Sequence, residues 1–108
     1  MAAQYINVDR VSHHDHQQSI ESCDINYSPL ENAMWKIKDF KVKYPLLSGI
    51  DPYGHTFFNT IQIPNLVTEL NKYKKEEVVK PFVEDIDKLI VLLEKPTTPH
   101  TYIEFTGD

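Results

Sequence analysis

The chain has 108 residues, of which 41% are hydrophobic and 25% charged, so we expect one domain with one core over residues 1–108. Its formal net charge of −5 disfavours nucleic-acid binding, because contacts to phosphates require a basic surface. No stretch approaches the roughly 20 apolar residues of a membrane span. Cys23 is the sole cysteine, which excludes an intramolecular disulfide and favours a reducing, cytoplasmic location.

The N-terminal residues alternate between apolar and polar side chains. Ile6 and Val8 lie two positions apart with Asn7 and Asp9 on either side of Val8, which is the period of a half-buried strand. This pattern predicts a strand over about residues 3–12. Residues 12–26 are mostly polar with scattered apolar side chains, and this composition predicts a loop.

A helix is predicted over residues 29–44. Ser28 is expected to be its N-cap, with Pro29 at the first helical position and Glu31 completing a capping box. Pro45 is expected to end it. The apolar stripe of this helix comprises Leu30, Ala33, Met34, Ile37, Phe40 and Tyr44.

The middle of the chain contains turn, strand and helix signals in succession. Residues 51–54, Asp-Pro-Tyr-Gly, carry the preferred residues of a type I turn. Residues 55–63 are predicted as a strand, with Phe57 and Ile61 on one face. Pro64 is expected to open a second helix.

The longest apolar stripe lies in the last third of the chain and predicts a helix from about Lys80, since Pro81 is tolerated only in a first turn. Pro96 is expected to end this helix, and residues 100–105 alternate as a final strand. The order is β-α-β-α-α-β. It predicts an α+β fold with a small, mostly antiparallel sheet of about three strands and three helices packed on one face.

Histidines provide the densest group of metal-capable side chains. His14 and His16, in the cluster over residues 13–16, form an H-x-H pair that could supply two ligands, and His55, His100 or Asp51 could supply a third. The spacing matches no established zinc motif. A polar loop is the simpler interpretation, and we expect no cofactor.

Aromatic side chains provide the candidates for binding a partner. Tyr5, Phe58 and Tyr102 are expected on the sheet face away from the helices, where they are either covered by the loop of residues 12–28 or exposed as an aromatic patch that would mark a binding surface. Trp35 lies off the helical stripe, where it either packs at the helix edge against the sheet or a loop or acts as an anchor for a partner. The candidate partner-binding residues are Trp35, Tyr53, Phe58, Tyr102 and Glu104.

Two segments resemble parts of short uncharacterised bacterial proteins. They are Tyr-Pro-Leu-Leu-Ser-Gly-Ile-Asp-Pro-Tyr-Gly at residues 44–54 and His-Thr-Tyr-Ile-Glu-Phe-Thr-Gly-Asp at residues 100–108. The resemblance implies a bacterial or phage origin and no catalytic residues. Small acidic proteins of this size also resemble toxin-immunity proteins.

These features favour a non-enzymatic protein-binding module, of the immunity or inhibitor type, that neutralises a larger partner with a basic surface. Complementary charge would accelerate that association. One alternative is a phage-encoded inhibitor of a host defence protein. The alternative from another class is a small metal-dependent enzyme that uses the cluster at residues 13–16.

Overall fold

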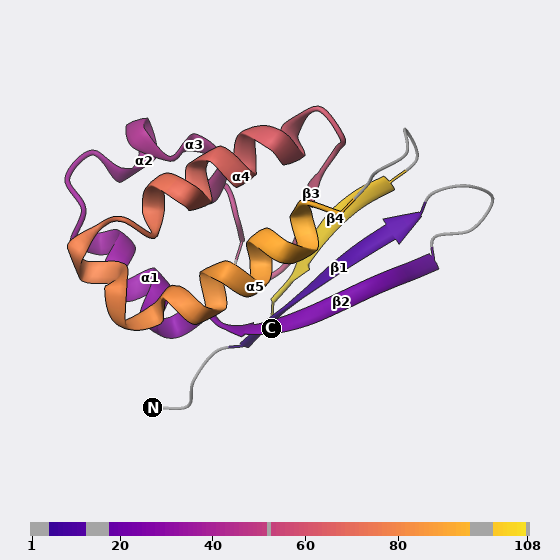
Figure 1. Cartoon of the computed structure of the whole chain (residues 1–108), viewed down its shortest axis with the longest axis horizontal. Helices are drawn as coiled ribbons and strands as arrows, with labels where there is room; N and C mark the ends of the chain where they lie inside the picture. Colours follow the sequence, from indigo (N-terminus) through magenta and orange to yellow (C-terminus); the bar gives the residue numbers. More distant parts are fainter. Residues whose placement is uncertain (1–4, 13–17, 52, 96–100, 108) are drawn as a thin grey trace.

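The computed structural model describes residues 5–12, 18–51, 53–95 and 101–107 (Figure 1). The expected α+β class is confirmed, and the described residues form a sheet of four strands rather than about three, with more helices than expected. The elements are β1 (Tyr5–Ser12), β2 (Gln18–Asn26), α1 (Tyr27–Trp35), α2 (Phe40–Lys43), α3 (Pro45–Ser48), β3 (His55–Phe58), α4 (Gln62–Tyr73), the 3₁₀ helix η1 (Glu77–Phe82), α5 (Val83–Leu93) and β4 (Thr101–Thr106).

The four strands form an antiparallel sheet in the order β2-β1-β4-β3. β1 and β2 are consecutive, and an irregularity between Arg10 and Val11 shifts their register. In the centre of the sheet Val8 lies opposite both Cys23 on β2 and Phe105 on β4. The N-terminal and C-terminal strands are therefore neighbours.

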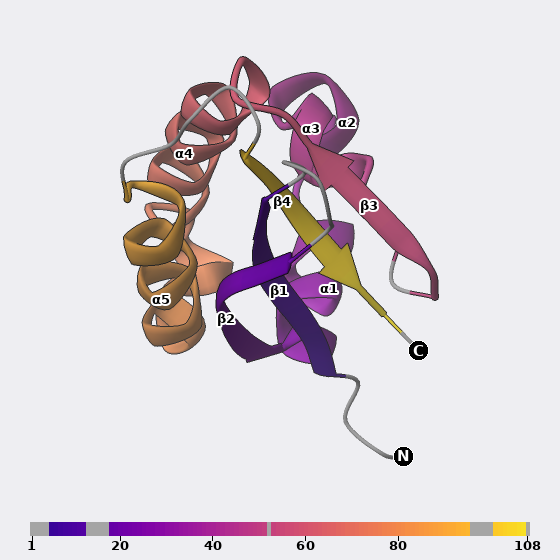
Figure 2. The same cartoon turned by 90° about the vertical axis from the view of Figure 1, so that its right-hand side faces the viewer.

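In the described part of the chain, the helices pack against one face of the sheet. The side chains that alternate onto this face are buried, and Figure 2 shows the helices gathered on one side of the strands. α5 packs on β2 and β1, while α4 packs against α5 and α3. The buried apolar residues of the strands on this face are Ile6, Val8, Ile25, Phe58, Ile103 and Phe105.

The loop expected over residues 12–26 is wrong, because residues 18–26 form strand β2. Ile25 is buried opposite Ile6, and half-buried Cys23 lies opposite Val8, so the two residues alternate with polar Asp24 and Asn26. Two apolar positions are a weak signal in isolation. Pairing with β1 supplies the backbone hydrogen bonds that make this polar segment a strand.

The helix expected over residues 29–44 is divided in two. α1 begins at Tyr27 and ends at Trp35, and α2 begins after Asp39, whose φ of 58° and ψ of 36° lie in the left-handed region. Aspartate is among the residues that tolerate this conformation. Ser28 lies inside the first turn, and the N-cap is Asn26, which makes no side-chain capping hydrogen bond. The predicted Ser28 cap is therefore wrong.

Three aromatic rings form a cluster where α1, α2 and α4 meet. The rings of Phe40, Tyr44 and Tyr73 lie 5.1 to 5.8 Å apart between centroids. The Tyr73 hydroxyl donates a hydrogen bond of 2.7 Å to the Leu30 carbonyl of α1. The Tyr44 hydroxyl donates one of 2.6 Å to Glu76 Oε2. Each buried phenol thus has an acceptor, as burial of a polar group requires.

α3 is a single turn whose N-terminus is capped from another helix. Pro45 occupies its first position, where the missing N–H is no loss. The N–H groups of Leu46 and Leu47 donate to the carboxylate of Glu69 on α4 at 3.0 to 3.1 Å. A negative charge at a helix N-terminus is favourable, so Glu69 joins α3 to α4.

The strand expected over residues 55–63 ends at Phe58, because the next residues turn into α4. Asn59 Oδ1 accepts hydrogen bonds from the N–H groups of Ile61 and Gln62, and Gln62 Oε1 accepts one from the Asn59 N–H. This reciprocal pattern is a capping box. α4 therefore begins at Gln62, and Pro64 lies within its first turn.

The stripe predicted for the last helix is buried. Ile86, Leu89 and Ile90 of α5 face the sheet and α4, while Phe82 is partly buried in η1 just before it. The helix proper begins at Val83, since Pro81 lies in the 3₁₀ helix. Among the described residues, no helix has the length and apolar character needed to span a membrane.

Leu89→Ala should lower the free energy of unfolding by about 2 to 5 kcal/mol, because the buried side chain leaves a cavity. Val91→Ala on the same helix is the matched control, since Val91 is exposed and should cost less than about 0.5 kcal/mol. Denaturant titration measures both. Equal losses would show that Leu89 does not face the core.

Asn59→Ala should lower the free energy of unfolding by about 1 kcal/mol through loss of the α4 cap. Thr60→Ala changes the neighbouring turn residue and should have little effect. Thermal or denaturant unfolding of the two variants provides the comparison. An Asn59 variant as stable as the Thr60 variant would contradict the capping role.

Alkaline pH should destabilise the protein. Burial raises the pKa of Tyr27, Tyr44 and Tyr73, so their neutral phenols are favoured in the folded state, whereas the unfolded chain ionises near pH 10. Stability is then retained below about pH 10 and falls as pH rises above it. Denaturant midpoints should show this decline, and Tyr73→Phe should make it shallower. An unchanged slope in the variant would contradict the assignment.

Candidate functional site: the open face of the sheet

The face of the sheet opposite the helices carries polar side chains in two registered rows. Each row crosses all four strands, from β2 through β1 and β4 to β3. We call the eight residues of these rows the open face. The first row is Asp24, Asn7, Thr106 and His55, and the second is Ser22, Asp9, Glu104 and Phe57.

Hydrogen bonds between neighbouring strands organise the first row. Asn7 Nδ2 donates to Asp24 Oδ1 at 2.9 Å. His55 Nδ1 lies 2.8 Å from Glu104 Oε2 and 3.5 Å from Thr106 Oγ1. The imidazole therefore lies beside a carboxylate, where its protonated form makes an ion pair. These contacts fix the orientation of side chains that remain accessible to solvent.

The second row places two carboxylates directly opposite each other. Asp9 on β1 pairs in register with Glu104 on β4. Like charges at directly opposed positions of a sheet are unfavourable. With Asp24 one row away, the open face carries three acidic residues over three adjacent strands. Its electrostatic character is therefore negative.

The structure brings together some of the expected partner-binding residues and separates others. Tyr102 and Glu104 alternate onto the same side of β4, away from buried Ile103. Tyr53 is exposed in the turn before β3, and the backbone bond from Gly107 to Gly54 joins that turn to the end of β4.

The predicted turn itself forms. The Gly54 N–H donates to the Asp51 carbonyl, and the Tyr53 N–H donates to Asp51 Oδ1. Trp35 is exposed but belongs to α1, among the helices rather than on the open face.

The expectation that Phe58 lies on the open face is wrong. Phe58 is only 3% exposed and packs edge-on against Phe105, whereas Phe57 is 45% exposed and belongs to the open face. A register shift of one residue moves every side chain of a strand to the opposite face of the sheet. The register of the short strand β3 is fixed by the pairing of Phe58 with Ile103. The side chain of Tyr5 is not among those described.

The proposed metal ligands are only partly testable. His14, His16 and His100 lie outside the described residues, and His55 is on the open face beside Glu104. Among the residues that are described, no group of three histidine, cysteine, aspartate or glutamate side chains is placed to hold a metal ion.

Asp9, Asp24 and Asn7 were not singled out as site residues from the sequence. Their only signal was the polar half of each strand's alternation, which is typical of any solvated sheet face. It is the strand register that places them in rows with Glu104.

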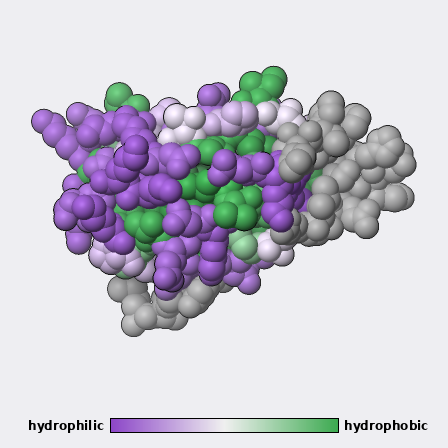
Figure 3. Space-filling view, in the orientation of Figure 1, coloured by the Kyte–Doolittle hydropathy of each residue, from purple (hydrophilic) through white to green (hydrophobic). Residues whose placement is uncertain are grey.

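A concave region lies between β2 and α5, on the face of the molecule seen in Figure 1. It is a pocket of about 440 Å³ whose lining includes Cys23, Lys88, Val91 and Leu92. Apolar surface is visible in the middle of this face within a hydrophilic surround (Figure 3). Burial raises the pKa of the Cys23 thiol, which favours its neutral form.

No protein-family model, curated protein or solved structure matches this chain.

Proposed function

We propose that the protein is a non-enzymatic binding module that associates with a basic protein surface through the open face of its sheet. The main observation that supports this proposal is the placement of Asp24 on β2, Asp9 on β1 and Glu104 on β4 on the same face of three adjacent strands. A cationic partner surface would form ion pairs with these carboxylates, and the complementary charge would accelerate association.

The neighbouring aromatic side chains support the same proposal. Phe57 ends the second row, Tyr102 lies two residues before Glu104 on the same side of β4, and Tyr53 is exposed in the adjoining turn. Aromatic side chains at the margin of a charged surface supply apolar contact area, and tyrosine is enriched among residues that dominate binding energy. A flat sheet face bordered in this way suits a protein surface better than a small molecule.

An immunity-type or inhibitor role fits this surface, since such a protein works by occupying a larger partner rather than by chemistry. A phage-encoded inhibitor of a host defence protein would use the same face. The acidic net charge of −5 adds long-range attraction to a basic target. The partner's identity distinguishes the two roles, because one is a toxin from the same genome and the other belongs to the host.

Reversing charge on the open face should weaken partner binding. An Asp9→Lys/Glu104→Lys double variant replaces attraction by repulsion and should lower affinity at least about tenfold, with much of the loss in the association rate. The partner is first captured from lysate of the source cells with tagged protein and identified by mass spectrometry. Surface plasmon resonance with the purified partner then measures the rates at two salt concentrations.

Glu94→Lys is the matched control, because it reverses one exposed charge at the end of α5. It should leave affinity within about twofold, as expected for a charge outside the interface. Circular dichroism establishes that each variant is folded. Equal affinity of the wild type and the double variant would contradict the proposal, and stoichiometric zinc that survives chelation would favour the metal-dependent alternative.

A further inference from the structure

The interruption between α1 and α2 creates a concave surface on the helical side. The Lys36 N–H donates to the Ala33 carbonyl at 3.0 Å as α1 ends, and the Val42 N–H donates to the Asp39 carbonyl at 3.0 Å as α2 begins. Because Asp39 has a left-handed backbone, the chain turns between these two bonds. α1 and α2 therefore form two walls instead of one continuous rod.

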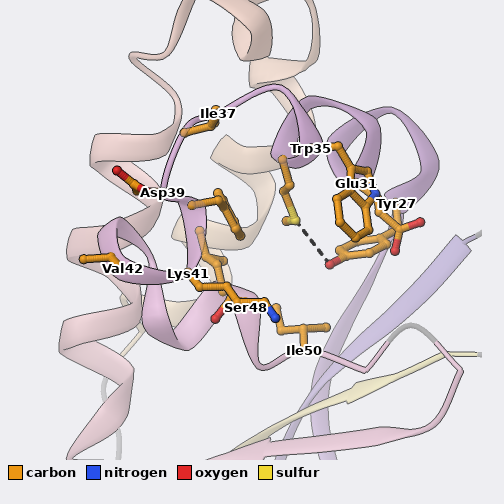
Figure 4. A pocket seen from close by; sticks show the side chains of 12 residues that line it. Tyr27, Glu31, Trp35, Ile37, Asp39, Lys41, Val42, Ser48 and Ile50 are labelled. Atoms are coloured by element: carbon orange, nitrogen blue, oxygen red, sulfur yellow. Dashed lines mark hydrogen bonds between the residues drawn. The ribbon is translucent and has the colours of Figure 1, made fainter.

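The space between these walls is a pocket of about 520 Å³. Its volume is within the range of about 300 to 1,000 Å³ that is usual for ligand sites. Figure 4 shows Trp35 and Val42 on opposite sides of this space, with Ile37 and Ile50 also around it. We call it the α1–α3 pocket. Its apolar lining includes Met34, Trp35, Phe40, Val42, Leu47 and Ile50.

Two large apolar side chains at this pocket are exposed to solvent. Trp35 is 80% exposed and Val42 is 81% exposed, although both line the pocket. An exposed tryptophan beside an apolar pocket is typical of a binding surface, because it gains contact area when a partner covers it. Neither residue is needed to fill the core of the free protein.

The surroundings of the pocket have a charge opposite to that of the whole chain. Residues 36–43 contain four lysines and a single acidic residue, Asp39, in a protein of net charge −5. The lysines, Lys36, Lys38, Lys41 and Lys43, are all exposed. Lys41 lines the pocket, as do Glu31 and Asp39. The positive charge is therefore concentrated on the segment that carries α2.

We propose that the α1–α3 pocket is a second binding site, which takes an acidic amphipathic segment of a partner protein. One or two large apolar side chains of that segment enter the pocket between Trp35 and Val42. Carboxylates next to them pair with the exposed lysines of residues 36–43. This arrangement is the helix-in-groove mode of recognition, with charge fixing the orientation.

The shape of the pocket favours a protein segment over the other anionic partners. A bilayer surface is approached by protruding apolar side chains rather than by a concavity. A nucleic-acid strand would need a continuous basic groove along which successive bases stack, whereas this site is a single pocket that combines aromatic Trp35 with aliphatic Leu47 and Ile50. A protein segment with an apolar anchor flanked by carboxylates can contact both the apolar lining of the pocket and the lysines around it. The inference is independent of the open face.

Trp35 makes the proposal testable, because it is the only tryptophan in the chain. The probe is a synthetic peptide with leucine at positions i, i+3, i+4 and i+7 and glutamate elsewhere, titrated into the full-length protein. Trp35 emission should shift to shorter wavelength and saturate. A peptide with lysine in place of glutamate should produce no saturable shift at the same concentrations.

Substitutions of the exposed lysines and of Val42 test whether the peptide binds at this pocket. Lys38→Glu/Lys41→Glu should weaken binding of the acidic peptide at least about tenfold, and Val42→Asp should weaken it comparably. All three positions are exposed, so these proteins should fold normally. Lys88→Glu on α5 and Glu104→Lys on the open face are the matched controls. Both should leave peptide affinity unchanged, which separates this site from the proposed function.

Three outcomes would overturn the proposal. The first is an absence of any saturable shift with the acidic peptide. The second is binding of the acidic and basic peptides with equal affinity, which would reduce the pocket to a nonspecific apolar surface. The third is a Trp35 shift with phosphatidylglycerol vesicles but none with the peptide, which would assign the lysines to a lipid surface instead.

Discussion

The hydrogen bond from the Tyr73 hydroxyl to the Leu30 carbonyl is the contact on which the helical layer depends. It joins α4 to α1 at a buried position, and the Tyr73 ring also packs against Phe40 and Tyr44. A buried phenol without an acceptor would cost about 1 to 3 kcal/mol, so the relative position of the helices is tightly constrained. The aromatic cluster also accounts for the interruption at Asp39. It brings Phe40 and Tyr44 onto Tyr73, and the pocket between α1 and α2 is a consequence of that packing.

Strand register imposes the corresponding constraint on the sheet. Because Val8 and Phe105 are buried opposite each other, Asn7, Asp9 and Glu104 must point to the other face. The acidic rows are therefore fixed by the same alternation that fills the core. A shift by one residue in β1, β2 or β4 would place a carboxylate in the core, and burial of an unpaired charge is very unfavourable. The face proposed to bind a partner is thus as strongly specified as the core.

Local patterns in the sequence predicted β1, the helix of residues 83–93 and the final strand, where apolar periodicity is long or regular. They missed β2, because its three apolar residues, Ile20, Cys23 and Ile25, do not keep a regular spacing of two and its stability comes from pairing with β1. They also missed the left-handed turn at Asp39, since the apolar stripe continues through it and the contacts of Phe40 and Tyr44 with distant Tyr73 are not visible in a local pattern. Glu104 and Tyr102 were candidate partner-binding residues from the sequence of their strand, whereas the positions of Asp9 and Asp24 beside them become visible only when the strands are placed in register.

The two proposed surfaces carry opposite charge on one small chain, which raises the question of why copies would not bind each other. Local attraction between the acidic rows and the lysines of residues 36–43 acts at contact distance, while repulsion between net charges of −5 is screened beyond about 8 to 10 Å at physiological ionic strength. Charge alone would therefore permit head-to-tail association. Shape opposes it, because the α1–α3 pocket needs a protruding apolar anchor and the open face presents polar rows with a half-exposed Phe57 at one end. Both proposed surfaces would thus remain available to different partners, one basic and one acidic.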